Sequence, residues 1–176
     1  MEPSYVPEGY ITPLFYWDEE NTSNRLHISE DRLSIKVING AGFKTSFGTE
    51  GFSERERYYF EIKIIKGTLI KIGVSKQLDN NNQAFTDVPE GWGIYNGETR
   101  HNSNALGSKY GERINPGDVI GIMLDMVEGK ISFSCNGVCW GVAYESEELT
   151  EGKYFPAVAP IYLNDEYRIC LPQPED

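Results

Sequence analysis

The feature that most constrains this chain is the Asn-Gly dipeptide, which occurs three times in 176 residues. This dipeptide readily adopts the positive φ angles that a two-residue type I′ hairpin turn requires. Apolar and polar residues alternate on both sides of Asn39-Gly40 and of Asn136-Gly137. A period of two indicates strands with one buried face, so both dipeptides predict antiparallel hairpins.

Other runs predict the remaining strands. Residues 59–64 and 69–74 alternate about Lys66-Gly67 and predict a third strand pair. Residues 119–124 are apolar without alternation, which predicts a strand covered on both faces. Residues 154–163 and 166–171 supply the last two strands, and 146–149 fit one helical turn. Short strands at this spacing predict an all-β fold, a two-sheet antiparallel β-sandwich.

Trp140 follows the second of these hairpin turns and should share a face with Val138 and Val142. Phe133 lies on the other arm of the same hairpin. The alternation predicts that Trp140 is a core residue.

The net charge of the chain limits the classes of partner that it is expected to bind. Asp and Glu number 27 against 16 Lys and Arg, giving a formal net charge of −11. Such a field repels phosphate backbones and anionic membranes, so we expect neither nucleic acid nor a membrane as partner. The same charge opposes self-association, and we expect a monomer. It serves solubility or forms an acidic docking face, and the sequence leaves both open.

The N-terminus and the cysteines indicate the compartment. Met1–Tyr5 lack the basic start and apolar run of a signal peptide, and no apolar stretch approaches the length of a membrane span. Cys135 and Cys139 flank a two-residue turn on opposite sheet faces, which disfavours a disulfide. We therefore expect reduced, buried thiols and a cytoplasmic or nuclear protein.

No residue pattern predicts a metal or a cofactor. The segment from Asp79 begins like a calcium loop, with Glu90 at its twelfth position, but Ala84 stands where the sharp turn needs glycine. His27 and His101 have no cysteine at ligand spacing. We expect His27 to face solvent from a strand and His101 to be exposed in a loop.

Catalytic residues are not predicted either. A glycosidase needs two carboxylates at neighbouring inward positions, whereas the acidic clusters here fall in turn-like segments. The glycine-rich stretch at 91–93 is not followed by a helix that could hold a phosphate. We expect variable chemistry on the irregular segments 48–57, 78–91 and 97–111, because strands are committed to packing.

Eight short motifs follow one another in the second half of the chain. They are Gly91-Trp92-Gly93-Ile94, Tyr110-Gly111, Gly117-Asp118-Val119-Ile120-Gly121, Leu124-Asp125-Met126, Gly129-Lys130-Ile131-Ser132-Phe133, Asn136-Gly137, Gly141-Val142-Ala143-Tyr144 and Phe155-Pro156-Ala157-Val158. The order of these motifs resembles that of the SPRY domain family. The similarity covers residues 15–172, with 1–14 as an N-terminal extension and 173–176 as a C-terminal tail, and 26–32 look like the PRY segment.

The resemblance implies a bent β-sandwich of concanavalin-like jelly-roll architecture that catalyses nothing. Such domains recognise peptides or protein surfaces through loops, often as substrate-selecting parts of ubiquitin ligases or as adaptors. In the SOCS-box branch an Arg-Pro-Ala stretch and a Val-Trp-Gly stretch hold an acidic, Asn-rich peptide. The corresponding positions here are Val37, Asn39 and Ala41, then Ile161, Tyr162 and Leu163. Only the alanine matches the first stretch, so that peptide preference does not carry over.

The first hypothesis is therefore a protein-interaction module. Its candidate contact residues are Asn39, Phe85, Ile161, Tyr162 and Leu163. Core packing is the alternative for each. The second hypothesis is a lectin or hydrolase on a similar sandwich, for which Phe85 near Asp79 and Asn81 is the one grouping that could stack a sugar. A purely structural domain is the third.

Overall fold

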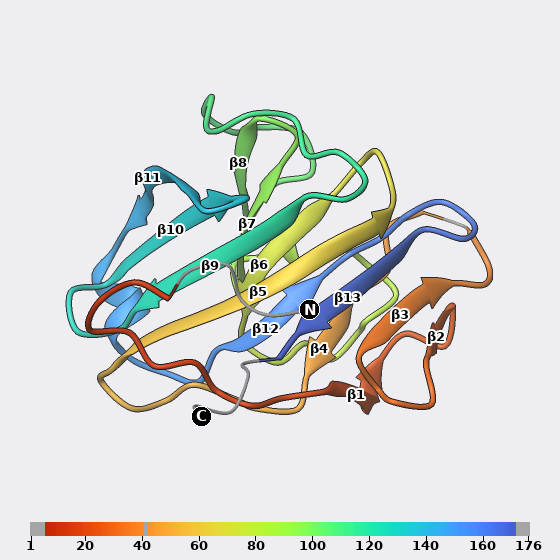
Figure 1. Ribbon diagram of the computed structural model, residues 1–176, viewed down its shortest axis with the longest axis horizontal. Coiled ribbons are helices and arrows are strands. Elements are labelled where there is room, and N and C mark those ends of the chain that lie inside the picture. Colours follow the sequence, from red (N-terminus) through yellow and green to blue (C-terminus); the bar gives the residue numbers. More distant parts are fainter. Residues whose placement is uncertain (1–5, 41, 172–176) are drawn as a thin grey trace.

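The computed structural model of the chain describes residues 6–40 and 42–171, and in it two antiparallel sheets pack face to face (Figure 1). Met1–Tyr5, Ala41 and the predicted tail 173–176 lie outside these residues. The six-stranded sheet has the order β1-β4-β12-β6-β7-β8, formed by Trp17–Thr22, Ser46–Gly48, Phe155–Val158, Lys71–Ser75, Gly91–Tyr95 and Glu98–His101. The seven-stranded sheet has the order β11-β10-β9-β5-β13-β3-β2, formed by Val138–Glu145, Lys130–Cys135, Val119–Asp125, Arg57–Lys66, Glu166–Cys170, Ser34–Val37 and Leu26–Ile28. The predicted two-sheet sandwich is confirmed.

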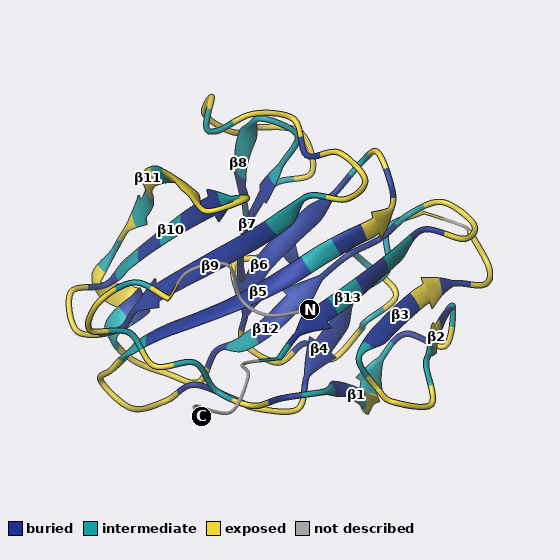
Figure 2. Ribbon diagram, in the orientation of Figure 1, coloured by how far each residue is buried: buried dark blue, intermediate teal, exposed yellow. Residues whose placement is uncertain are grey.

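The main core lies between the sheets and is built from the alternating positions of both. Phe60 and Ile62 of β5 and Ile72 and Val74 of β6 are at most 1% exposed. The strand β9, inside the seven-stranded sheet, is buried along nearly its whole length, as the absence of alternation predicted (Figure 2). Burying this much apolar side chain supplies most of the drive for the two sheets to pack.

A second, smaller apolar cluster covers the outer face of the six-stranded sheet. It contains Phe47, Leu78, Ala84, Phe85, Ala157 and Ala159. The segment between β6 and β7, with the 3₁₀ turn η1 (Phe85–Asp87), lies over this face. All five residues of β6 are consequently buried, so this strand is covered on both sides.

Two of the three Asn-Gly dipeptides form hairpin turns. Asn136 and Gly137 have φ angles of 50° and 83° and join β10 to β11, which confirms that hairpin. Asn96 and Gly97 have φ angles of 42° and 83° and join β7 to β8. This second hairpin was not predicted, because 97–111 looked irregular in sequence.

The other two predicted strand pairs are wrong. Asn39 and Gly40 have no positive φ, and the strands on either side, β3 and β4, belong to different sheets. The strands flanking Lys66-Gly67, β5 and β6, also lie in different sheets. In both places the chain crosses from one sheet to the other, which alternation cannot distinguish from a hairpin because both connections join half-buried strands.

Strand β11 breaks the alternation on which the burial of Trp140 was predicted. Between the Ser132–Val142 pair and the Ser134–Cys139 pair, β11 contains one residue more than β10. Gly141 lies within this bulge at a φ of 91°. An extra residue moves the side chains that follow it to the opposite face.

As a result Trp140 is only partly buried, at the edge of the core, with its ring against Tyr110. Val138 and Val142 are 64% and 53% exposed, so they do not share a buried face with it. The prediction that Trp140 is a core residue was too strong, and the prediction that it shares a face with these two valines gave them the wrong environment. The exposed positions of β11 show as yellow at the edge of the sheet in Figure 2.

Histidine and cysteine placement differs in part from the prediction. His27 is exposed on β2, as expected. His101 is not in a loop: it ends β8, and its ring stacks on Trp92 with centroids 3.6 Å apart. All three cysteines are free thiols, but Cys139 is exposed rather than buried.

Helix is confined to two 3₁₀ turns in the described part of the chain. The predicted turn is η2 (Glu147–Thr150), where the Ser146 side chain accepts a hydrogen bond from the backbone N–H of Glu148. No helix in the described ranges is long and apolar enough to cross a membrane.

Candidate functional site

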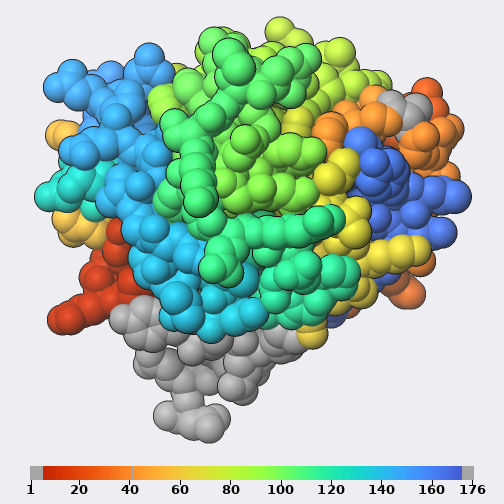
Figure 3. Space-filling model, turned by 90° about the horizontal axis from the view of Figure 1, so that it is seen from above, coloured from red at the N-terminus to blue at the C-terminus, as the bar shows by residue number. Residues whose placement is uncertain are grey.

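Two neighbouring loops carry four of the five predicted contact residues. Residues 38–45 connect β3 to β4, and residues 159–165 connect β12 to β13. The loops touch: the backbone N–H of Lys44 donates to the Pro160 carbonyl at 3.2 Å, and that of Asn164 donates to Val37 at 2.9 Å. Figure 3 shows the orange and the late blue segments side by side at one end of the molecule.

Large apolar side chains are exposed on these loops. Ile38, Tyr162 and Leu163 are 54%, 50% and 56% exposed. Asn39 is exposed beside them, and we call these four residues the loop patch. Ile161 is half-buried, and its carbonyl lies so close to Gly40 that a Cβ there would be 3.4 Å away. The patch thus combines apolar contact area with one amide side chain, a composition typical of protein-binding surfaces.

The charge around the loop patch differs from that of the whole chain. Residues 33–48 contain Lys36 and Lys44 and no acidic residue, whereas the whole chain carries a net charge of −11. Residues 159–164 carry no charge. Within these two segments an acidic partner meets no like-charged side chain.

Asp165 holds the second loop in shape. Its buried carboxylate accepts a hydrogen bond from the backbone N–H of Tyr162 at 3.0 Å, and its own N–H donates to the Tyr162 carbonyl at 2.9 Å. Burial raises the pKa of the Asp165 carboxyl, and hydrogen bonds from the N–H groups of Tyr162 and Ile161 offset this only partly. Asp165 is thus a positioning residue for Tyr162.

This arrangement predicts opposite effects for two substitutions. Asp165→Ala leaves the Tyr162 N–H without its acceptor and should lower the free energy of unfolding by about 1 kcal/mol. Asp165→Asn keeps an acceptor oxygen and removes the buried charge, so at pH 7 it should be at least as stable as the wild type. Because the folded-state pKa of Asp165 is raised, the stability that this residue contributes to the wild type should fall as the pH rises from its unfolded-state pKa through its folded-state pKa.

Urea unfolding of the three proteins between pH 3 and pH 7 measures both effects. The stability of the Asn variant relative to the wild type should rise over this range, because only the wild type carries the Asp165 carboxyl. An Asn variant as unstable at pH 7 as the Ala variant would contradict the assignment.

Phe85 is buried, which differs from the exposed position that a contact residue was expected to have. Its side chain is 0% exposed in the cluster on the outer face of the six-stranded sheet. Glycines make room for it: a Cβ on Gly93 would lie 3.1 Å from the ring, and one on Gly91 would lie 1.9 Å from the Phe85 carbonyl oxygen. A buried ring cannot stack a sugar, so the one grouping that favoured a lectin is lost.

Next to the loop patch lie polar and aromatic residues that are not among the predicted contact residues. Lys71 and Arg100 are buried, and Phe43 and Tyr95 pack beside them. The Tyr144 hydroxyl accepts from the Arg100 backbone N–H at 2.7 Å and donates to the Gly93 carbonyl at 2.6 Å. Burial raises the pKa of Tyr144 to about 12, so this hydroxyl keeps its proton at neutral pH.

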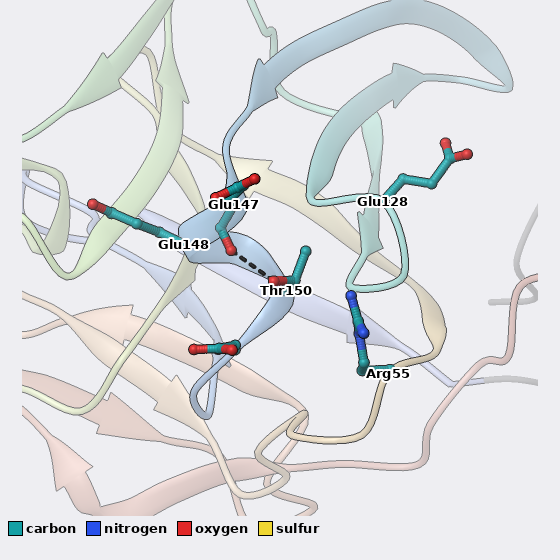
Figure 4. Close-up of a pocket in the computed structure, with 6 residues that line it drawn as sticks. Arg55, Glu128, Glu147, Glu148 and Thr150 are labelled. Carbon is teal, nitrogen blue, oxygen red and sulfur yellow. Dashed lines mark hydrogen bonds between the residues drawn. The ribbon is translucent and has the colours of Figure 1, made fainter.

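An acidic hollow lies elsewhere on the molecule (Figure 4). It is lined by Arg55, Glu128, Glu147, Glu148, Thr150 and Glu151. In Figure 4 the side chains of Glu128, Glu147 and Glu148 point in different directions and do not converge on one point. Among the described residues, no group of three or more His, Cys, Asp or Glu side chains could hold a metal ion.

Curated proteins with similar sequences share only part of their length with this chain. Drosophila melanogaster "ATP-dependent RNA helicase Ddx1" is 28% identical over 153 residues, which cover 85% of this chain and 20% of that protein. Xenopus tropicalis "SPRY domain-containing SOCS box protein 3" is 27% identical over 155 residues, covering 81% and 42%. Danio rerio "Ran-binding protein 9" is 35% identical over 92 residues, covering 49% and 15%.

Solved structures share the fold. The SPRY domain of human HERC1 superposes with a TM-score of 0.71 at 21% identity, covering 90% of this chain and 99% of that one. The TRIM65 PSpry domain superposes with a TM-score of 0.69 at 15% identity, covering 90% and 93%. The sequence model of the SPRY domain matches residues 57–174, about two thirds of the chain. This protein therefore belongs to the SPRY domain family.

Proposed function

We propose that this chain is a non-catalytic protein-interaction module whose partner docks on the loop patch. The observation that carries the proposal is the exposure of Tyr162 and Leu163, at 50% and 56%, on a loop held by Asp165. Aromatic and aliphatic side chains presented by an ordered loop bury large area at low entropic cost. The partner in this proposal is a peptide or protein surface with apolar side chains that meet these two residues.

The adaptor role is part of the same proposal. The module selects a partner, and a ligase activity or other chemistry comes from a different domain or chain. The proposal is supported by membership of the SPRY family and by the SOCS box named in one relative. Monomeric state and cytoplasmic or nuclear location, expected from charge and cysteine content, belong to it as well.

The test removes the two exposed side chains without touching the core. Tyr162→Ala and Leu163→Ala should each weaken partner binding by about 1–2 kcal/mol, a factor of about 5 to 30 in Kd. Both should unfold at the wild-type temperature, because an exposed loop side chain contributes little to stability.

The partner is first identified by affinity capture from the source cell with quantitative mass spectrometry, and its Kd is then measured by calorimetry. Val142→Ala is the matched control, because Val142 is 53% exposed on β11, the edge strand of the seven-stranded sheet that lies farthest from β3. Equal capture and equal Kd for all three variants would rule out the loop patch as the docking surface.

A further inference from the structure

Two basic side chains are buried on the outer face of the six-stranded sheet. The side chains of Lys71 on β6 and Arg100 on β8 are each 4% exposed. In the strand register Lys71 lies opposite Tyr95, and Arg100 lies opposite Gly93. The Cβ position of Gly93 faces the Phe85 ring, so the side chains of Lys71 and Arg100 lie on the face that Phe85 covers. Burying a cation is unfavourable unless anions and hydrogen-bond acceptors surround it, so their presence here needs an explanation.

The acceptors within the described residues do not satisfy these two cations. Lys71 Nζ lies 3.4 Å from Asp87 Oδ1, a long contact for an ion pair. Arg100 Nη2 donates to Glu98 Oε2 at 2.6 Å, but its Nε and Nη1 are buried with no partner in the described part of the chain. A guanidinium has five N–H donors and an ammonium has three, so several donors remain for another acceptor.

An aromatic ring holds the two cations next to each other. Lys71 Nζ lies 5.4 Å and Arg100 Cζ lies 5.0 Å from the centre of the same Tyr95 ring, and Lys71 Nζ lies 4.0 Å from that of Phe43. Burial lowers the pKa of Lys71, and the positive charge of Arg100 lowers it further, against the attraction of Asp87. We call Lys71, Arg100, Phe43 and Tyr95 the cradle. An anion that contacts both cations of the cradle would reduce the repulsion between them.

This cradle adjoins the loop patch. The Lys71 carbonyl accepts a hydrogen bond from the backbone N–H of Ala159, where the 159–165 loop begins. Phe43 belongs to the 38–45 loop, whose Lys44 N–H donates to Pro160. The same two loops therefore carry the loop patch and the Phe43 ring of the cradle.

We propose that Lys71 and Arg100 form an anion-binding subsite beside the loop patch, which takes a carboxylate or phosphoryl group carried by the partner. The inference rests on the proposed function of the patch and gives its partner a charge. Asp87 and Glu98, which form ion pairs with Lys71 and Arg100, lie nearer the solvent, and their side chains are 30% and 45% exposed. The incoming anion replaces one of these carboxylates as the partner of the two cations.

The test uses inorganic and small organic anions as probes and needs no partner. The Arg100 Nε–H resonance of the ¹⁵N-labelled wild-type protein is followed while sodium phosphate or sodium acetate replaces sodium chloride at constant ionic strength. The resonance should shift and saturate with at least one of the two probes. Saturation with phosphate alone assigns a phosphoryl group, and saturation with both assigns a general anion site that accepts carboxylates.

Two variants change the affinity in opposite directions. Lys71→Met keeps an unbranched apolar side chain and removes the ammonium group that lies over Phe43, so it should weaken probe binding about tenfold. Asp87→Asn removes the competing carboxylate and should strengthen binding about threefold. Lys36→Met is the control with the same charge change, because Lys36 is 46% exposed on β3 of the other sheet.

A resonance that does not saturate with either probe, or that shifts as much when chloride is varied, would overturn the subsite. Equal weakening by Lys71→Met and Lys36→Met would also overturn it, because it would assign the effect to net charge. If Lys71→Met does not fold, Asp87→Asn decides, and unchanged affinity counts against the proposal. The result is independent of the Tyr162 and Leu163 variants, so either proposal can fail alone.

Discussion

Phe85→Ala is expected to lower the free energy of unfolding by about 3–5 kcal/mol. The Phe85 ring is 0% exposed and packs with Leu78, Ala157 and Ala159 in the smaller apolar cluster. Truncation removes the transfer free energy of the ring and leaves a cavity that the strands β6 and β7 cannot fill, because Gly73, Gly91 and Gly93 offer no side chain.

Urea denaturation followed by tryptophan fluorescence measures this loss. Tyr162→Ala serves as the control, because its side chain is half exposed and its loss should change stability by less than about 0.5 kcal/mol. If Phe85→Ala unfolds at the same urea concentration as the wild type, the ring does not support the sheet. A partner-binding role for Phe85 would then be open again.

The existence of most strands could be predicted because each has its own local pattern. β9 is a continuous apolar run, and β10 and β11 flank an Asn-Gly turn. Strand pairing was harder to predict, because it depends on where the chain crosses between sheets. The connections through Asn39-Gly40 and Lys66-Gly67 both cross, and no local residue pattern distinguishes them from the true hairpin at Asn96-Gly97.

The candidate site was predicted in part. Asn39, Ile161, Tyr162 and Leu163 were named from the family resemblance, and the structure brings their two loops into contact. Whether they bind a partner stays a prediction. Phe85 was misplaced because a loop aromatic was taken as exposed, although the loop itself covers a sheet.

A signal for this covering layer was present in the sequence. Gly73, Gly91 and Gly93 alternate with the core residues of two strands, so one face of each strand has almost no side chains. Such a face either lies open to solvent or receives another segment at close range. The same reasoning would have flagged Lys71, whose alternation with Ile70 and Ile72 made it look like an ordinary solvent-facing lysine.

Gly91→Ala is expected to lower the free energy of unfolding by about 3 kcal/mol. A Cβ at this position would lie 1.9 Å from the carbonyl oxygen and 2.5 Å from the carbonyl carbon of Phe85. Both are backbone atoms of η1, so no side-chain rotation relieves the clash and the turn must lift away from the sheet. Gly91 has no positive φ angle, so the effect measures close approach and not backbone strain.

A double-mutant cycle then tests whether Gly91 and the Phe85 ring stabilise the same packing contact. With Phe85→Ala in place, η1 no longer packs closely on the sheet and can shift away from the new methyl group. The cost of Gly91→Ala should therefore fall by about 1 kcal/mol or more in that background.

Gly137→Ala is the control, because Gly137 has a φ of 83°, no atom within 4 Å of its Cβ position, and lies in the β10–β11 turn of the other sheet. Its cost comes from backbone strain alone and should add to that of Phe85→Ala within about 0.5 kcal/mol. If the costs of Gly91→Ala and Phe85→Ala also add, then Gly91 and the Phe85 ring stabilise the sheet separately, contrary to the packing described.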